Sequence, residues 1–213
     1  FMSTGKMTKE KLVENRQQEI IRACEELYER MEYDEINIKE IAKSTSICRS
    51  NIYNYYETKD EIFLDIFKKE YLLWMEDMDR RMREDKDGGR ESYCRILAET
   101  AGGHPQLLKL ISMNYIAIER NCSLEKLTAF KREILPFRDR MREALGKYFP
   151  HASEERKEHF LLALLSLMQG LYSMTNLTEK QLKAMKRADP DYVQPDFEKN
   201  FCQALFSLSA ELI

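Results

Sequence analysis

The stretch Ile38–Lys59 reads IKEIAKSTSICRSNIYNYYETK, and its pattern decides how the rest of the chain is interpreted. Ile38 and Ile41 lie one helical turn apart, and Ile52 and Tyr56 repeat such a spacing after a polar segment. This pattern predicts two short helices, joined by a tight turn, whose apolar faces pack together. Two short helices cannot form a domain alone, so the remaining chain must supply a core.

The second of these helices carries an outward row of polar side chains that is suited to DNA. Arg and Asn form paired hydrogen bonds with guanine and adenine edges, while Tyr hydroxyls and Lys ammonium groups hold phosphates. A helix of about two turns fits the major groove, which is about 12 Å wide. The predicted DNA contacts in this row are Arg49, Ser50, Asn51, Tyr53, Asn54 and Tyr55, and Lys43, just after the first helix, is a further predicted contact.

The formal charge of the whole chain is −3, which does not by itself indicate nucleic-acid binding. The segment from Lys43 to Lys59 holds three cations and one anion, so it carries +2 while the rest of the chain carries −5. A modestly basic end on an acidic body is typical of a protein that touches phosphate with one face only.

Length and composition indicate a globular protein of one or two domains. Of the 213 residues, 43% are hydrophobic and 33% charged, and no apolar run approaches the roughly 18 residues of a membrane span. The N-terminal FMSTGKMTKEK lacks the apolar core of a signal peptide, so we expect a cytoplasmic protein. The five cysteines form no C-x-x-C pair and are odd in number, which favours buried thiols over a disulfide framework or a zinc site.

Catalytic and cofactor motifs are missing from the sequence. It contains no G-x-G-x-x-G, G-x-x-x-x-G-K-[ST], H-E-x-x-H or G-x-S-x-G pattern. Glu155 and His159 share a helix face and could form half a metal site, but an exposed helix pair explains them as well. We therefore expect no enzyme activity, no catalytic residue, no metal and no cofactor.

The central stretch resembles the tetracycline-repressor (TetR) family of bacterial transcriptional regulators over roughly residues 16 to 67. The matching features are Ile41-Ala42, Ile47, the run from Ile52 to Tyr56, and Lys59 at the start of a fourth helix. The resemblance implies that Tyr53, Tyr55 and Lys59 hold phosphate, and that Tyr56 is a core residue. Ser46 and Cys48 depart from the family pattern of a turn Gly and a capping Ser or Thr, so the turn geometry is expected to deviate there.

The rest of the chain reads as helices throughout, which predicts an all-α fold. The predicted helices include about Thr8–Met31, Gln106–Arg120 and Leu124–Tyr148, with Pro136 expected to kink or split the last. Asn37 and Ser153 are predicted N-caps, and Thr178 with Gln181 a predicted capping box. The resemblance implies an N-terminal three-helix, homeodomain-like helix-turn-helix domain, residues 1–58, and a C-terminal helical domain for ligand binding and dimerisation, residues 59–213. A linking helix from about 58 to 83 joins them, and residues 85–89 form the clearest loop. Ahead of the first helix, Lys6, Lys9 and Lys11 are read either as an arm that reaches DNA or as a frayed terminus.

Two later predicted helices, about 153–175 and 195–212, carry apolar residues around more of their circumference than a surface helix needs to bury. Paired across a two-fold axis they would form a four-helix interface, and the resembled family dimerises there. The resemblance also places a ligand pocket in the body, where the same residues could instead be ordinary core. The candidates are Met113, Tyr115, Phe137, Met141, Gln169 and Tyr172.

Three functions remain open at this point. The first is a homodimeric repressor that binds a palindromic DNA operator and is released by a small apolar or aromatic ligand. The second is a ligand-independent DNA-binding factor controlled by a protein partner. The third is a helical protein-interaction module whose helix-turn-helix pattern is fortuitous.

Overall fold

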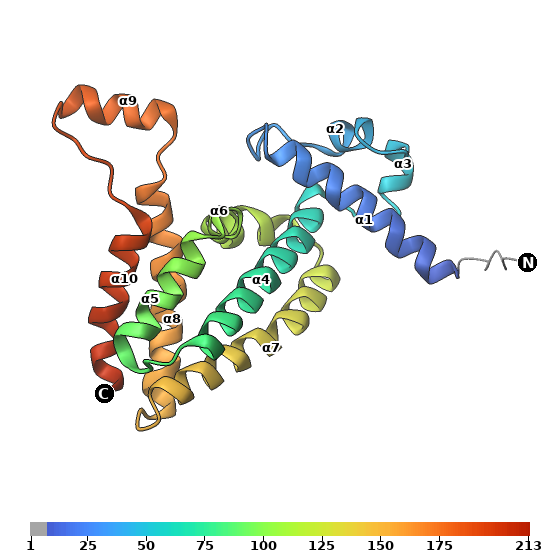
Figure 1. The fold of residues 1–213 in the computed structure, drawn as a ribbon. Coiled ribbons are helices and arrows are strands. Elements are labelled where there is room, and N and C mark those ends of the chain that lie inside the picture. Colours follow the sequence, from blue (N-terminus) through green and yellow to red (C-terminus); the bar gives the residue numbers. More distant parts are fainter. Residues whose placement is uncertain (1–7) are drawn as a thin grey trace, which may run out of the picture. The chain divides into compact units, whose positions relative to one another are not determined.

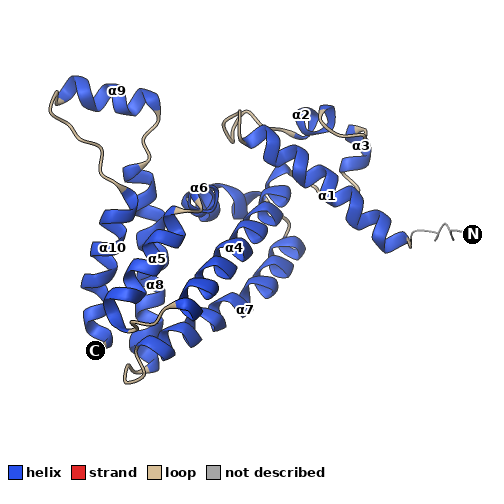
Figure 2. Ribbon diagram, in the orientation of Figure 1, coloured by secondary structure: helices blue, strands red, loops and turns tan. Residues whose placement is uncertain are grey.

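The computed structural model describes residues 8–213, and every regular element within that range is helical (Figure 1; Figure 2). The all-α prediction is therefore confirmed. Lys6, which the sequence suggests as part of a DNA-reaching arm, lies outside the described residues.

The ten α-helices of the described part follow one another with short connections. Their bounds are α1 Lys9–Tyr28, α2 Ile38–Lys43, α3 Arg49–Ile52, α4 Lys59–Glu84, α5 Gly89–Gly102, α6 Pro105–Met113, α7 Leu124–Tyr148, α8 Glu154–Thr175, α9 Glu179–Ala188 and α10 Phe197–Leu208. A π-helical turn, Asn114–Ile118, and a 3-10 turn, Glu119–Asn121, follow α6, and a 3-10 turn, Ser209–Leu212, follows α10.

The chain forms two compact units. Unit 1 holds residues up to Lys68 together with Ile116–Lys131, and unit 2 holds Lys69–Tyr115 and Arg132–Ile213. Helices α4 and α7 each contribute residues to both units. The chain therefore passes between the units within continuous helices or, after α6, within the π-helical turn.

Unit 1 is built on the buried stripe of α1, where Ile20 and Cys24 are completely buried. The side chain of Thr8 caps α1, and Asn37 caps α2 by accepting the backbone N–H groups of Lys39 and Glu40. The predicted Asn37 cap is thereby confirmed. α2 packs against α1 and α3, and an aromatic edge contact joins Tyr28 of α1 to Phe63 of α4, with ring centroids 5.1 Å apart.

Unit 2 is a helical bundle in which α5 packs on α10, α6 on α8 and α8 on α10. Trp74 of α4 is fully buried, and its indole N–H donates to Thr100 of α5 at 3.1 Å. The loop between α4 and α5 turns at Gly88 and Gly89, whose φ angles of 63° and 87° are readily available only to glycine.

Two helices differ in extent from the sequence prediction, and a third lacks an expected break. α1 ends at Tyr28 rather than near Met31, and the segment predicted as one helix from Gln106 to Arg120 is α-helical only to Met113. α7 is not split at Pro136, contrary to one expectation, because Pro136 and the residue four positions earlier are both exposed and water can satisfy the freed carbonyl.

Among the described residues, no single helix has both the length and the apolar character needed to span a membrane. Only the bent pair of α8 and α9, which meet at 69°, satisfies that test jointly.

Candidate nucleic-acid interface

The polar row predicted to read DNA lies on the surface of unit 1, at and just after α3. Arg49, Ser50, Asn51 and Asn54 are exposed, Tyr53 is 45% exposed and Tyr55 is half-buried. Beneath them Ile52 and Tyr56 are buried at 0% and 1% exposure. The segment thus has the two-sided character that a helix in the major groove requires.

The α-helix within this segment is shorter than predicted. α3 covers only Arg49–Ile52, and the chain continues in a turn where the N–H of Tyr55 donates to the carbonyl of Ile52 at 2.9 Å. In place of the expected helix of about two turns, the structure therefore has a single α-helical turn, followed by a turn whose N–H groups donate to carbonyls three residues earlier. Asn54 and Tyr55 are presented by this turn rather than by regular helix.

Two contacts organise the exposed row. The guanidinium of Arg49 lies 6.0 Å from the ring centroid of Tyr53, and its Nη2 donates to the Tyr53 hydroxyl at 3.5 Å. At the start of the helix, Ser50 Oγ lies 3.3 Å from the sulfur of Cys48. Cys48 occupies the N-cap position without a side-chain capping bond, as expected for a thiol.

The turn between α2 and α3 is held by side chains from α1. The N–H of Ser46 donates to Glu19 at 2.5 Å, and its hydroxyl accepts from Arg16 at 2.8 Å. No non-glycine residue in the described range has a positive φ angle, so Ser46 does not adopt the left-handed conformation expected of a family glycine. Thr45 completes the turn, since its hydroxyl bonds the backbone of Ala42 and Ile47.

The two predicted lysine contacts differ in their surroundings. Lys43 is exposed and pairs with Glu40 one turn earlier in α2, at 2.8 Å. Lys59 is half-buried, and its ammonium group donates to the carbonyl of Tyr33 at 2.5 Å and lies 4.1 Å from that residue's ring centroid. Lys59 therefore also holds unit 1 together, a role that its position in the sequence did not indicate.

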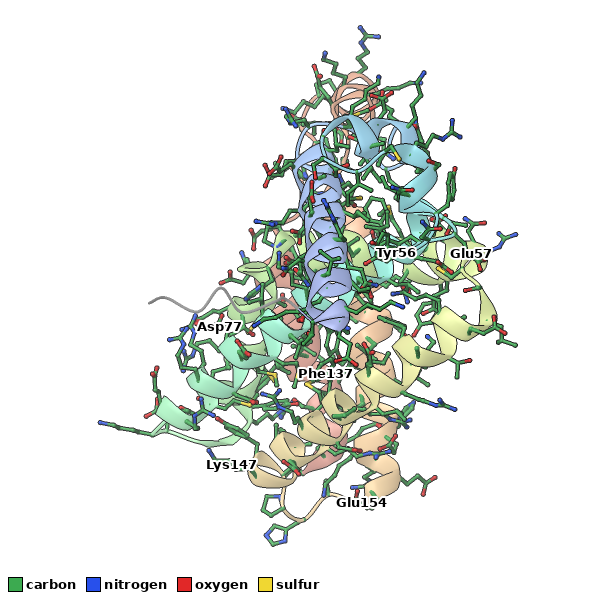
Figure 3. All side chains as sticks on the ribbon, turned by 90° about the vertical axis from the view of Figure 1, so that its right-hand side faces the viewer. Tyr56, Glu57, Asp77, Phe137, Lys147 and Glu154 are labelled. Carbon is green, nitrogen blue, oxygen red and sulfur yellow. The ribbon has the colours of Figure 1, made fainter. Side chains whose placement is uncertain are left out.

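Beneath the exposed row, Tyr56 connects the recognition segment to the helices behind it (Figure 3). Its hydroxyl donates to Asp65 of α4 at 2.8 Å, and Lys126 of α7 pairs with the same carboxylate at 2.7 Å. The Lys126 ammonium group also lies 5.1 Å from the Tyr56 ring centroid. Burial and the neighbouring Asp65 carboxylate raise the pKa of Tyr56, so this hydroxyl stays a donor at neutral pH.

A second connection to the same region centres on Glu61, which is 3% exposed. Its carboxylate accepts the N–H of Glu57 at 2.8 Å and both the N–H and the hydroxyl of Ser123, at 3.1 and 2.5 Å. The hydroxyl of Thr58 donates to the carbonyl of Asn121 at 3.2 Å. The segment 116–131 thus belongs to unit 1, although it lies more than 50 residues further along the chain and no sequence motif marked it.

Cys48 is expected to be the first of the five thiols to react with an alkylating reagent. It is exposed, and hydrogen bonding from Ser50 and from the N–H of Asn51 lowers its pKa. Burial raises the pKa of Cys24 and of Cys122 to about 12, and that of Cys94 and Cys202 by less. Peptide mapping after brief iodoacetamide treatment at neutral pH should find the label on Cys48, and Cys48→Ser should lose this fast phase. Fast labelling of any other cysteine would contradict this ranking.

The six ligand candidates all lie in unit 2 but differ in burial. Phe137 and Met141 are buried, whereas Tyr115 is 59% exposed; Met113, Gln169 and Tyr172 are half-buried. Phe137 stacks on Tyr71, with centroids 5.3 Å apart.

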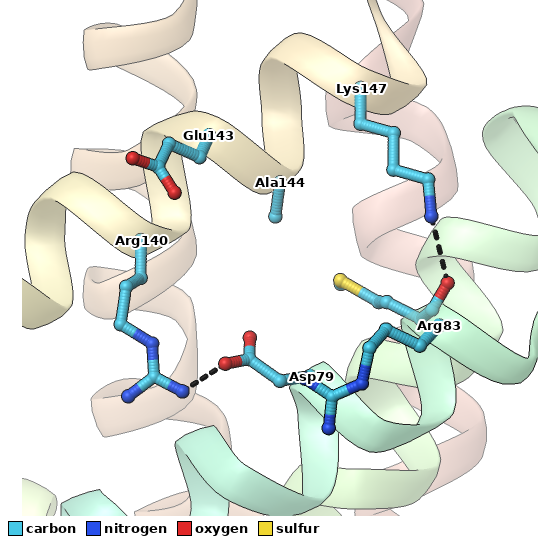
Figure 4. A pocket seen from close by; sticks show the side chains of 7 residues that line it. Asp79, Arg83, Arg140, Glu143, Ala144 and Lys147 are labelled. Atoms are coloured by element: carbon cyan, nitrogen blue, oxygen red, sulfur yellow. Dashed lines mark hydrogen bonds and ion pairs between the residues drawn. The ribbon is translucent and has the colours of Figure 1, made fainter.

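A groove of about 240 Å³ lies elsewhere in unit 2, between α4 and α7 (Figure 4). It contains an ion pair between Arg140 and Asp79, and Lys147 donates to the carbonyl of Met82 at 3.0 Å. None of the six ligand candidates lines it, and its charged walls are not those of an apolar ligand site.

Exposed apolar side chains lie on α8 and α10, the two helices that carry more apolar residues than packing within one chain requires. The exposed fractions on α8 are 66% for Leu162 and 37% for Leu165, and on α10 38% each for Phe206 and Leu208. Gly170 lies on the same stretch of α8, with no atom within 4 Å of the place that a β-carbon would take. We call these five residues the α8/α10 face.

A helix-turn-helix with an exposed polar row, followed by an all-helical second unit, defines a DNA-binding transcriptional regulator. Residues 68–209 match the family described as tetracyclin repressor-like, C-terminal domain. The chain belongs to the TetR family and is a transcriptional regulator of that type, as the resemblance in the sequence implied. TetR-family regulators are non-enzymatic DNA-binding proteins that dimerise and respond to small molecules.

Solved structures with the same fold come from several bacteria. The fatty acid degradation regulator FadR from Bacillus halodurans is 17% identical, with a TM-score of 0.57 over 90% of this chain and 94% of that one. A TetR-family regulator from Streptomyces coelicolor is 14% identical, with a TM-score of 0.60 over 93% and 99%. A regulator from Pseudomonas aeruginosa PAO1 is 14% identical, with a TM-score of 0.53 over 93% and 90%. No curated protein matches the sequence significantly.

Proposed function

We propose that this protein is a cytoplasmic, homodimeric repressor that binds a palindromic operator through the exposed row around α3 and is released by a small apolar or aromatic ligand. The observation that carries the proposal is the two-sided segment Arg49–Tyr56. Its polar side chains face solvent, while Ile52 and Tyr56 fix it to the interior of unit 1.

Within this proposal the exposed residues divide into two groups. Arg49, Asn51 and Asn54 carry the donor and acceptor patterns that read base edges. Lys43, Ser50, Tyr53 and Tyr55 bind phosphate and set the register on the duplex, as does Lys59 if it leaves the Tyr33 carbonyl. The Arg49–Tyr53 contact holds the guanidinium over the row before DNA arrives.

The α8/α10 face supports the proposed dimer. Leu162, Leu165, Phe206 and Leu208 would be covered by the same residues of a second copy around a two-fold axis. The two reading units would then contact half-sites one helical turn apart, roughly 34 to 36 Å. The two-fold symmetry of such a dimer is why a palindromic operator is expected.

Release by a ligand is proposed to follow from a shift between two arrangements of the dimer. α4 and α7 both contribute residues to unit 1 and to unit 2, so a ligand bound in unit 2 can change the position of the reading units through continuous helices. The ligand shifts the equilibrium only by its difference in affinity for the two arrangements. The six candidates around α6, α7 and α8 supply Met and aromatic side chains suited to an apolar compound.

Selection of bound duplexes from a random pool tests the proposed function directly. A palindromic product, bound with an affinity that falls steeply with salt, would support dimeric DNA reading. Failure to enrich any sequence at low salt would instead support the interaction-module alternative. With the selected duplex in hand, apolar and aromatic compounds can be screened for release, and a compound-insensitive complex would favour the ligand-independent factor.

Asn51→Ala is expected to relax sequence preference at one position of each half-site. A lost bidentate contact to a base removes about 1 to 3 kcal/mol of discrimination, which is roughly 5- to 150-fold in relative affinity. Tyr55→Phe removes one hydroxyl that is assigned to phosphate and does not contact Arg49, so it should weaken binding to all duplexes alike and serves as the matched control. Competition binding with the selected duplex and its single-base variants measures both effects. If Asn51→Ala changes neither affinity nor preference, the recognition row has been misassigned.

A further inference from the structure

Helix α9 projects from unit 2 as an arm between the ends of α8 and α10 (Figure 1). None of its residues is buried. Its N-terminus is closed by a capping box between Thr178 and Gln181, and its base is tied by a hydrogen bond from Gln194 to the carbonyl of Thr175 at 2.5 Å. The arm is therefore a defined element, yet a helix of this length gains little stability in water without packing.

The arm has two sharply different sides. At 100° per residue, one half of the helix holds Leu182, Ala184, Met185 and Ala188, and the other half holds Glu179, Lys180, Lys183, Lys186 and Arg187. Met185 is 40% exposed, and two further apolar side chains beside the arm, Met174 and Val193, are 71% and 82% exposed. One side thus resembles an interface that lacks its partner.

Most of the charged side chains of the arm form no ion pair within the described part of their own chain. Lys183 pairs with Glu179, but no ion pair is formed by Lys180, Lys186 or Arg187 in the described structure. The connection that follows has the opposite character. Residues 189 to 198, which form this connection and the start of α10, hold four carboxylates, no cation and, in the described structure, no ion pair: Asp189, Asp191, Asp196 and Glu198.

We propose that the arm packs onto a second copy of this chain, with its basic residues against the partner's acidic connection. This inference rests on the proposed homodimer and adds a second contact region to it. The arm leaves the ends of the two helices that carry the α8/α10 face, and exposed apolar side chains flank it: Met174 near the end of α8 and Val193 in the connection before α10. In a two-fold dimer each arm meets the other chain's acidic connection, so the complementary contact forms twice.

The charges favour this partner over the alternatives. A basic amphipathic helix can also bind a membrane surface or nucleic acid. Neither would explain why four carboxylates without a cation directly follow the basic helix, since they would repel both anionic surfaces. A second copy presents an acidic connection to each basic arm.

A charge-exchange experiment on the full-length protein tests the arm contact. One variant carries Lys186→Glu and Arg187→Glu, and the other carries Asp189→Lys and Asp191→Lys. Each homodimer then faces like charges, and its dissociation constant should rise about tenfold or more, measured by sedimentation equilibrium at low salt. Mixing the two variants should give heterodimers in large excess over the statistical half, measured by native mass spectrometry.

Controls separate this inference from the proposed function. The double variant Lys86→Glu with Arg132→Glu makes the same charge change at exposed sites outside the arm and should dimerise as the wild type does. A monomeric wild-type protein would overturn the proposed dimer itself. A dimeric wild type whose arm variants keep its dissociation constant and mix at the statistical ratio would overturn the arm contact alone.

Discussion

Leu162→Glu is expected to convert the homodimer into a monomer and to abolish tight binding to a palindromic duplex. Leu162 is 66% exposed on α8, so the change costs the isolated chain little. In the proposed four-helix interface the glutamate would be buried against the apolar side chains of a second copy. Burial of an unpaired charge costs several kcal/mol, which corresponds to a loss of dimer affinity of more than 100-fold.

Sedimentation equilibrium and binding to full and half-site duplexes measure the two consequences. Leu135→Glu is the matched control, since Leu135 is 54% exposed on α7 and lies outside the α8/α10 face. The control should remain a dimer, while Leu162→Glu should bind full and half sites with similar weak affinity. A dimeric Leu162→Glu protein would place the interface elsewhere.

Features of both units that local rules govern could be predicted from the sequence. Ile41 and Ile52 are each 0% exposed, as their helical spacing predicts. Asn37, Ser153 and the Thr178 capping box all form the helix starts that their sequence positions indicated, since a capping side chain needs only its own next residues.

Features that depend on distant parts of the chain could not be predicted in this way. The turn at Ser46 is held by Arg16 and Glu19, about 30 residues earlier, and these bonds replace the glycine conformation expected from the family pattern. The bond of Lys59 to the Tyr33 carbonyl follows from packing of the connection between α1 and α2 against the start of α4. Spacing within one segment contains no information about either contact.

The segment 116–131 is the clearest example of this limit. Ser123 and Lys126 looked like the unremarkable beginning of a helix in the second domain. In the structure they bind Glu61 and Asp65 of α4 and complete the reading unit. Part of α7 therefore stabilises the segment that carries α3. Glu61 and Asp65, which look like ordinary surface charges in the sequence of α4, hold these parts together.

Glu61→Ala is expected to destabilise the reading unit by about 3 kcal/mol. The buried carboxylate accepts three hydrogen bonds, two from Ser123 and one from the N–H of Glu57, and alanine would leave these donors without a partner. Each buried donor left unsatisfied costs about 1 to 3 kcal/mol, partly relieved where water enters. Urea unfolding should show an early loss of helical circular dichroism, while fluorescence of Trp74, the only tryptophan, should follow unit 2 at higher urea.

The pH dependence of this effect distinguishes the carboxylate from a general packing loss. Burial raises the pKa of Glu61, but the hydrogen bonds from Ser123 and Glu57 outweigh it and hold the pKa below its ordinary value of 4.5. A carboxyl group whose pKa is lower in the folded state contributes its stability above the ordinary pKa and loses it as the pH falls through the lower folded value. The stability difference between the wild type and Glu61→Ala should therefore be full at pH 7 and shrink below about pH 4.5. Glu57→Ala removes the same charge from an exposed position and should leave both the stability and this pH dependence unchanged. A difference for Glu61→Ala that stays constant down to pH 3 would show that the charged hydrogen bonds contribute nothing specific, and that α3 is supported by packing alone.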